Sequence, residues 1–440
     1  VRGSIMTTWY VSTTGDNSNI GHHPGAPFLT IQHAFDQLVS GDTVRIYAGR
    51  YAESNIDPGS ISDIKVINFG DGLVVIDGNA GSGSSLGNTV LAHNDWVIDG
   101  STGSNTQNIE IIGGSESCVR GEGGTGHSYS LKHVILTGRG TGDISDEDNS
   151  TNYGIKYLSS STIRNVVIRN FSIGAVVDIS NPGPIVFYNN LVYRIGATTN
   201  ARAIIDHENG DNEIYFNTIV GCTGSIGIDT GAGPAPTIKN NLLAENNFSD
   251  SGIYFDTSTN VLNNCVYTSI TPAPTRGAYN NLGAGTIDSS NLEVDPLFYN
   301  SNPWEEQFDN NVNGNFILSP GHFHYPGSSR GGGVSSTLLT AGTPVTNITT
   351  DFSGSTRRSA TPTIGALEWA GIIYDFDTKP DACFSIDKVL SDFTINHFNN
   401  ISCETPRSVE QIPFSKAIVG PSNLKDRTTA YKLEKGKEGS

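Results

Sequence analysis

Short apolar runs separated by Gly, Asp and Asn dominate this chain, and one amphipathic segment precedes them. Residues 30–38 place apolar side chains on one helical face, with Thr30 as the N-cap and Gly41 as the stop. Later runs such as Val74, Val75 and Ile76 are β-branched, and no other amphipathic stretch of about ten residues occurs before about residue 380. The pattern predicts one short helix followed by many short strands.

The strands recur with a period near 25 residues. Five asparagines, each followed by an apolar triplet, are spaced by 25, 27, 24 and 23 residues. They are Asn165, Asn190, Asn217, Asn241 and Asn264. His133 and Glu110 extend the same column upstream, where a longer interval accommodates an acidic loop. We interpret the column as structural, because stacked amides hydrogen-bond from coil to coil and Asn tolerates left-handed backbone geometry.

A second column, of aspartates, lies in the other half of each repeat. Its members, Asp178, Asp206, Asp229 and Asp256, each close an apolar segment. Two strands per repeat therefore stay in phase, which favours a parallel β-helix with coils stacked about 4.8 Å apart. Leucine-rich repeats would need a leucine consensus, and a propeller would need about forty residues per blade.

The chain divides into three parts on this pattern. We expect residues 1–7 to be a leader or upstream extension, 8–370 to form the β-helix, and 371–440 to form a small attachment or assembly module. Residues 371–440 carry nine Lys and Arg against ten Asp and Glu, whereas residues 1–370 carry 17 against 34. The helix at 30–38 is expected to cap the first coil, because covering an open sheet edge blocks aggregation. The fold class is all-β.

Charge, hydropathy and cysteine content argue against several kinds of partner and site. The net charge of −18 repels nucleic acid and anionic membranes. No run of eighteen apolar residues could span a membrane. The five cysteines show no CxxC spacing, which argues against a zinc site and a disulfide framework, although Cys383 and Cys403 could pair.

Several motifs resemble those of right-handed parallel β-helix proteins. They lie at the start of the chain, in residues 27–32 (PFLTIQ), and near its end, in residues 294–298 (VDPLF), 315–321 (NFILSPG) and 364–368 (IGALE). That superfamily includes pectate, alginate and chondroitin lyases and phage tailspike-like proteins. The resemblance spans roughly residues 8–369 and concerns caps and closing coils, so it implies a fold more than an activity.

The resemblance to lyases implies a groove on one sheet, a Lys or Arg base and a second cation or Ca²⁺ that neutralises a uronate carboxylate. By alternation, Arg169 and Arg194 are expected at equivalent exterior positions one coil apart, where they could grip a carboxylate or sulfate. Lys156 is exterior on its strand and is the candidate base. The alternative is that all three are ordinary surface cations.

The densest polar group in the repeats is Arg202, Asp206, His207 and Glu208. Its acids and histidine could act as acid and base in glycoside hydrolysis or bind Ca²⁺, but a loop-closing turn has the same composition. The aspartate column likewise either caps turns or binds a divalent cation or sugar. For stacking on sugar faces, Tyr254 and Trp304 are the candidates.

Two functions remain open from the sequence. One is an extracellular β-helix that engages an extended polysaccharide and cleaves it as a lyase or hydrolase. The other is a non-catalytic virion surface or tail protein, or an adhesin, which implies a homotrimer or a virion or cell-surface assembly built through residues 371–440. The acidic balance favours the second, because a lyase for anionic polysaccharide is expected to show a basic groove.

Overall fold

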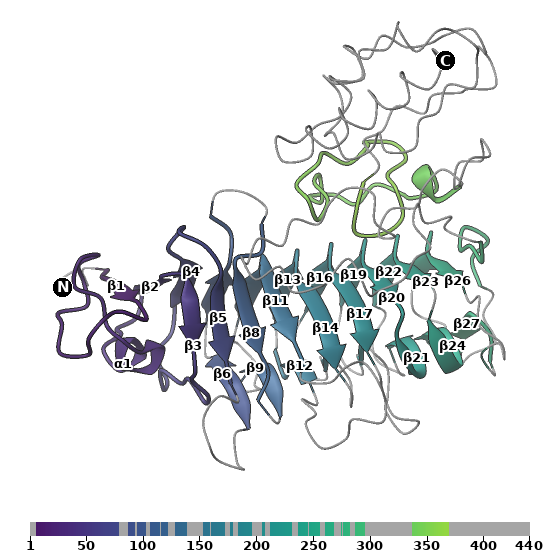
Figure 1. Ribbon diagram of the computed structural model, residues 1–440. Coiled ribbons are helices and arrows are strands. Elements are labelled where there is room, and N and C mark those ends of the chain that lie inside the picture. Colours follow the sequence, from purple (N-terminus) through teal and green to yellow (C-terminus); the bar gives the residue numbers. More distant parts are fainter. Residues whose placement is uncertain are drawn as a thin grey trace, which may run out of the picture.

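The computed structural model describes residues 6–78, 87–92, 95–102, 106–114, 116–121, 128–138, 153–158, 160–171, 177–178, 184–195, 205–206, 212–230, 236–244, 246–255, 260–267, 274, 276–281, 287–294 and 337–368. Every structural statement below concerns these residues. They form a parallel β-helix, in which three parallel sheets run along one column (Figure 1).

From β4 onward each turn of the column contributes one strand to each sheet, and every pair of neighbouring strands is parallel. Sheet A contains, in spatial order, β1 (Thr8–Val11), β2 (Thr43–Ile46), β4 (Lys65–Asn68), β7 (Trp96–Asp99), β10 (Tyr129–Lys132), β13 (Ser161–Arg164), β16 (Val186–Tyr188), β19 (Glu213–Tyr215), β22 (Thr237–Lys239) and β25 (Asn260–Leu262). Sheet B contains β3 (Gly49–Tyr51), β5 (Val74–Asp77), β8 (Ile109–Ile112), β11 (Val134–Thr137), β14 (Val167–Phe171), β17 (Leu191–Ile195), β20 (Thr218–Val220), β23 (Leu242–Ala244) and β26 (Cys265–Tyr267). Sheet C contains β6 (Asn88–Ala92), β9 (Ser117–Gly121), β12 (Tyr153–Lys156), β15 (Val177–Asp178), β18 (Ile205–Asp206), β21 (Thr223–Asp229), β24 (Asn247–Phe255) and β27 (Tyr279–Asn281).

Alternation along these strands fills the interior with apolar side chains. Ile155 of sheet C, Ile163 of sheet A and Ile168 of sheet B are fully buried in one shared core. Their neighbours one residue away face outward, because successive side chains of a strand point to opposite faces. The sequence therefore determines which residues are available on the outside of each sheet.

An asparagine ladder between sheets A and B holds the coils in register. Its members are Asn190, Asn217, Asn241, Asn264 and Asn291. From Asn217 onward, each side-chain oxygen accepts hydrogen bonds from the backbone and side-chain nitrogens of the preceding asparagine, at 2.9–3.1 Å. The four from Asn190 to Asn264 are buried, so these bonds satisfy polar groups that water does not reach.

Three residues expected in this ladder lie outside it. Val166, and not Asn165, faces Asn190, and its backbone nitrogen donates to the Asn190 Oδ1 at 2.9 Å. Asn165 and His133 share the neighbouring position, with positive φ values of 55° and 54°. Glu110 lies two residues further on, opposite Ile135 of β11. The apolar triplets alone did not distinguish these adjacent positions.

The neighbouring position is a second column in the left-handed backbone region. Asn165, Asn189, Phe216, Asn240 and Asn263 all have φ between 53° and 60°. Asparagine tolerates this geometry better than most residues, which explains its recurrence there. The two columns together account for the pairs Asn189-Asn190, Asn240-Asn241 and Asn263-Asn264.

A short helix lies at the N-terminal end of the column, where the amphipathic segment was expected (Figure 1). Helix α1 spans Ile31–Phe35, and the Thr30 hydroxyl accepts from the His33 backbone nitrogen as predicted. The helix ends before Leu38, so it is shorter than its apolar pattern. Glu53 adds a second cap, because its carboxylate accepts from the backbone nitrogens of the first two helical residues at 2.8 Å.

Residues 337–368, the lateral segment, form no rung of the column. They lie against the outside of sheet B from β11 to β26, as the green trace in Figure 1 shows. Phe352 and Leu367 pack on outward apolar residues of β11, β14 and β17, and Leu338 and Ile364 pack on those of β20, β23 and β26. The expected closing motif at 364–368 therefore lies beside the coils.

Polar contacts fix the lateral segment to the left-handed column. Asn189 and Asn240 donate through Nδ2 to the carbonyls of Thr350 and Thr343, at 2.8 and 2.7 Å. Arg357 donates to the Asn189 side-chain oxygen at 2.8 Å and lies 3.8 Å from the centre of the Phe216 ring. The outward side chains of the column thus serve as an attachment line for this segment.

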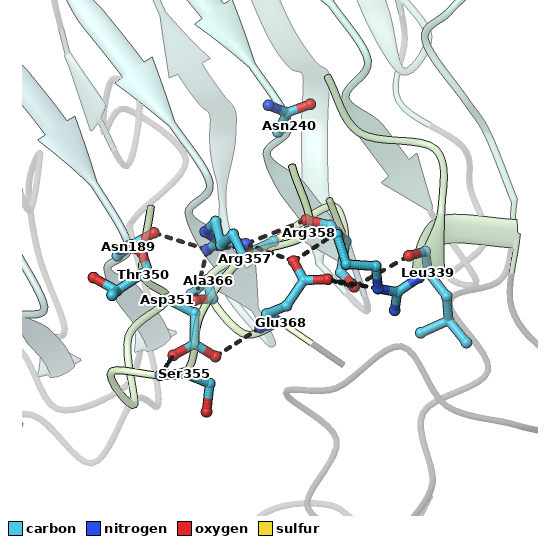
Figure 2. A network of polar contacts seen from close by, with 12 residues as sticks. Asn189, Asn240, Leu339, Thr350, Asp351, Ser355, Arg357, Arg358, Ala366 and Glu368 are labelled. Atoms are coloured by element: carbon cyan, nitrogen blue, oxygen red, sulfur yellow. Dashed lines mark hydrogen bonds and ion pairs between the residues drawn. The ribbon is translucent and has the colours of Figure 1, made fainter. Parts of the chain in front are cut away.

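A buried charged cluster locks the lateral segment internally (Figure 2). Arg357 and Glu368 are 5% and 2% exposed, and their nearest charged atoms are 3.5 Å apart. Glu368 also pairs with Arg358 at 3.1 Å, and its backbone nitrogen donates to Asp351 at 2.8 Å. Burial lowers the pKa of Arg357 to about 10 and raises the pKa of both Asp351 and Glu368.

The remaining expectations concern the ends of the chain and its cysteines. Residues 1–5 and 371–440, with Cys383 and Cys403, lie outside the described ranges. Cys118, Cys222 and Cys265 are buried, and none of these three described cysteines forms a disulfide. In the described ranges, no helix is long and apolar enough to cross a membrane.

Candidate functional site

Five of the seven predicted site residues that the structure describes share one column on sheet C. Strand pairing places Arg120, Lys156, Asp178, Asp206, Asp229 and Tyr254 at the same position of six consecutive strands. The neighbouring inward residues, such as Ile155, Ile228 and Ile253, are fully buried. We call this line the sheet C column. At about 4.8 Å per strand it is about 24 Å long.

Lys156 lies at the cationic end of the sheet C column. Its ammonium is 2.7 Å from a carboxylate oxygen of Glu116 and lies 4.5 and 4.8 Å from the ring centres of Tyr153 and Tyr157. Arg120 approaches the same carboxylate at 3.4 Å. Two cations, one carboxylate and two aromatic rings therefore form a single cluster on β9, β12 and the residues that flank them.

The protonation of this cluster follows from its geometry. Burial alone would lower the pKa of Lys156, but the hydrogen bond and charge of Glu116 outweigh burial and raise that pKa. The hydrogen bond from Lys156 in turn lowers the pKa of Glu116 against a smaller opposing effect of burial. At neutral pH, Lys156 is therefore a fixed ammonium ion, which binds anions well and accepts a proton poorly.

Aspartates occupy the middle of the column. The pairing of β15, β18 and β21 aligns Asp178, Asp206 and Asp229, as the spacing predicted. The predicted fourth member, Asp256, lies outside the described ranges, and Tyr254 takes the next position in the column, opposite Asp229. A register shift between Gly224 and Ile226, where β24 has one residue more than β21, places Tyr254 instead of Ile253 opposite Asp229.

An aromatic and ionic group closes the far end. Tyr254 is partly exposed, as expected for a stacking residue, and the Arg276 guanidinium lies 5.8 Å from its ring centre. Arg276 also pairs with Asp250 at 3.2 Å. The ring of Tyr254 is thus held beside a charge, in the arrangement typical of cation–π contacts.

The two arginines predicted for substrate binding on sheet B are not equivalent. Arg169 is outward but only 7% exposed, and it donates to Glu110 and Thr137 at 3.0 and 3.1 Å. Its register partner is Tyr193, so Arg194 lies one position further along its strand. The expected pair of exterior arginines one coil apart is therefore wrong in register, and the guanidinium of Arg169 is already engaged.

The other predicted residues are only partly covered. Arg202, His207, Glu208 and Trp304 lie outside the described ranges, and their roles stay predictions. Within the described part of the chain, no group of three or more His, Cys, Asp or Glu is arranged to hold a metal ion.

Sequence reasoning missed Glu116, Arg120, Tyr153, Tyr157 and Arg276. Alignment of the segment before the acidic loop with the later repeats would have found Arg120, because it occupies the register position of Lys156. The others gather around the column from neighbouring positions or turns, which a period alone does not reveal.

No protein-family description and no curated protein matches this chain. Among solved structures, the chain is similar to one titled as pectate lyase Pel9A, with 16% identity over 83% of this chain and 97% of that chain and a TM-score of 0.45. It is also similar to XylC in complex with xylose (12% identity, 62% and 70% coverage, TM-score 0.41) and to a rhamnogalacturonan lyase (13% identity, 68% and 90% coverage, TM-score 0.36). The class of the protein, a parallel β-helix with a polar outward column on sheet C, rests on the strand pairing itself.

Proposed function

We propose that this protein is an extracellular β-helix that binds an extended polysaccharide along the sheet C column. The observation that carries the proposal is the alignment of Lys156, the aspartates and Tyr254 at one register position of sheet C. A straight row of donors, acceptors and an aromatic ring matches a linear chain of sugars, which offers hydroxyl groups and apolar ring faces at regular intervals.

Binding is better supported than cleavage. A lyase base has to accept a proton near the operating pH, and the ion pair with Glu116 keeps Lys156 protonated there. We assign Lys156 the role of holding a sugar hydroxyl or carboxylate. Asp206, His207 and Glu208 remain the candidates for acid and base catalysis, because Asp206 ends β18 and the other two follow it directly in the sequence.

The non-catalytic alternative is a virion surface or tail protein, or an adhesin, that uses the same column as a receptor contact. The ion pair between Lys156 and Glu116 favours this alternative over a lyase, because it keeps the candidate base protonated. Incubation with alginate, pectate and chondroitin separates the two, because a lyase produces unsaturated uronates that absorb light. A reducing-end assay detects hydrolysis. If neither assay detects a product while the protein still binds the polysaccharide, the non-catalytic alternative is supported.

Replacement of Tyr254 by alanine is expected to weaken polysaccharide binding roughly tenfold, because the aromatic stacking surface of the column is lost. Lys156→Gln should give a similar loss. Affinity electrophoresis against a panel of neutral and acidic polysaccharides measures both. Arg50→Gln is the matched control, because Arg50 is an exposed cation on β3 of sheet B. Equal affinity of Tyr254→Ala and the unmodified protein for every ligand would rule out this site.

Asp178, Asp206 and Asp229 are also the proposed Ca²⁺ ligands. They share one register position on neighbouring strands, and carboxylate oxygens are the donors that Ca²⁺ prefers. Because the described residues contain no ready group of three such ligands, we propose that a neighbouring pair of aspartates binds the ion together with water. Ca²⁺ at a hundredfold excess over Kd should therefore raise the free energy of unfolding by about 2.7 kcal/mol. The melting temperature should rise accordingly. Asp229→Asn should abolish most of the increase. The metal proposal fails if Ca²⁺ and Mg²⁺ leave the melting temperature of the unmodified protein unchanged.

A further inference from the structure

The outer face of sheet A gathers positive charge in a chain that is acidic as a whole. Its two outward columns carry five cations, Arg45, Lys65, Lys132, Arg164 and Lys239, and two carboxylates, Asp99 and Glu213. The inward neighbours Val44, Val66, Ile163 and Ile238 are buried, which fixes the direction of the cations. The face therefore has a charge of +3 in a chain whose net charge is −18.

The outer face of sheet A differs from the other described surfaces in that most of its cations lack an acidic partner. Every described Lys and Arg side chain elsewhere has an acidic partner within 4 Å, and so has Lys132, whose ammonium is 3.0 Å from Asp99. Within the described ranges, Arg45, Lys65, Arg164 and Lys239 form no such pair. With 44 acidic residues in the chain, an unpaired set confined to one sheet is a distinct feature.

Aromatic rings accompany the unpaired cations along the face. Tyr10 is the register partner of Arg45, and Tyr188 is the partner of Arg164. Burial raises the pKa of Tyr188 while the charge of Arg164 opposes this, which reports their proximity. Tyr47 and Phe69 stack at 3.9 Å just beyond β2 and β4.

We propose that the outer face of sheet A is a second binding surface, for a linear acidic polysaccharide. Arg45 and Arg164 are four strands apart and Arg164 and Lys239 three, so the cations are spread over about 34 Å at about 4.8 Å per strand. A single line of this length matches one extended polymer with repeated anionic groups. The rings of Tyr10 and Tyr188 supply stacking surface for sugars, which a sulfate or carboxylate alone would not use.

The net negative charge of the chain makes nucleic acid and anionic membranes poorer ligands for this face than a polysaccharide. Nucleic acid and an anionic bilayer extend well beyond the two columns of this face, so both would also meet the rest of a chain whose net charge is −18. A single flexible glycan stays within the two columns. This surface is independent of the sheet C column, and its variants leave Lys156 and Tyr254 unchanged.

Binding to dextran sulfate tests the proposal, with unsulfated dextran of equal length as the ligand control. The full chain should bind dextran sulfate at low ionic strength, and Arg164→Gln/Lys239→Gln should weaken binding roughly five- to tenfold. The charge-conserving Arg164→Lys/Lys239→Arg and the control Arg50→Gln should bind like the unmodified chain. Thermal melting verifies that the substitutions leave the fold intact.

Three outcomes would overturn the proposal. The first is no binding of dextran sulfate, or binding that Arg164→Gln/Lys239→Gln leaves unchanged. The second is tighter binding of a single-stranded DNA oligonucleotide than of dextran sulfate. The third is self-association of the unmodified chain that Arg164→Gln/Lys239→Gln abolishes, because an acidic surface of a second copy would then be the natural occupant. A failure of the Tyr254 variants on sheet C bears only on the first site.

Discussion

Replacement of Asn217 by alanine should lower the free energy of unfolding by roughly 3 to 5 kcal/mol. The Asn217 side chain is fully buried and lies in the middle of the asparagine ladder. Its oxygen accepts two bonds from Asn190, and its nitrogen donates to the Phe187 carbonyl and to Asn241. Alanine leaves several of these groups buried without a partner, which costs more than the lost bonds themselves.

Chemical denaturation followed by circular dichroism measures this effect. Asn260→Ala is the control, because Asn260 is exposed on β25 and should change stability by less than about 0.5 kcal/mol. Asn217→Asp tests the donor separately, since a carboxylate retains the acceptor and loses the NH₂ group. If Asn217→Ala were as stable as Asn260→Ala, the ladder would not hold the coils together.

Replacement of Arg357 by methionine should cost a similar amount, about 3 to 5 kcal/mol, because it leaves Glu368 and Asp351 buried with less compensating charge. The lateral segment should detach from sheet B before the rest of the protein unfolds. Cys265 reports this, since the thiol packs under Leu338 and Ile364 of that segment. Its reaction with a thiol reagent in native buffer should accelerate in Arg357→Met.

Arg358→Met is the matched control for this experiment. Arg358 pairs with the same carboxylate but its side chain is 31% exposed, against 2% for Arg357, so the loss should be much smaller. Substitution of the other cysteines by serine isolates the signal of Cys265. Unchanged labelling of Cys265 in an Arg357→Met protein of reduced stability would show that the cluster does not fasten the segment.

The sequence was sufficient to predict the parallel β-helix, because a period near 25 leaves few architectures. It did not assign every asparagine, because two adjacent positions favour Asn for different reasons. In Asn189-Asn190, Asn240-Asn241 and Asn263-Asn264 the first residue adopts the left-handed conformation and the second joins the ladder. Asn165 stands alone, and spacing gave no means to choose between the two roles.

The candidate site was predictable where strands stay in phase. Lys156, Asp178, Asp206 and Asp229 follow from alternation and period. The prediction fails where the register differs from the assumed spacing. Val166, and not Asn165, faces Asn190, so Arg169 pairs with Tyr193 instead of Arg194, and Tyr254 takes the position expected for Asp256. Long-range packing was also invisible, since no periodic signal shows that residues 337–368 return to cover Arg169 and its neighbours.

That return has a mechanical consequence. A stack of coils that touch only their neighbours can open from one end, one coil at a time. The lateral segment instead packs across the middle and the last coils and connects them to one another. Loss of the last coil would therefore require the lateral segment to detach as well. The second half of the column should open cooperatively, whereas the first coils, which the lateral segment does not reach, should open independently of it.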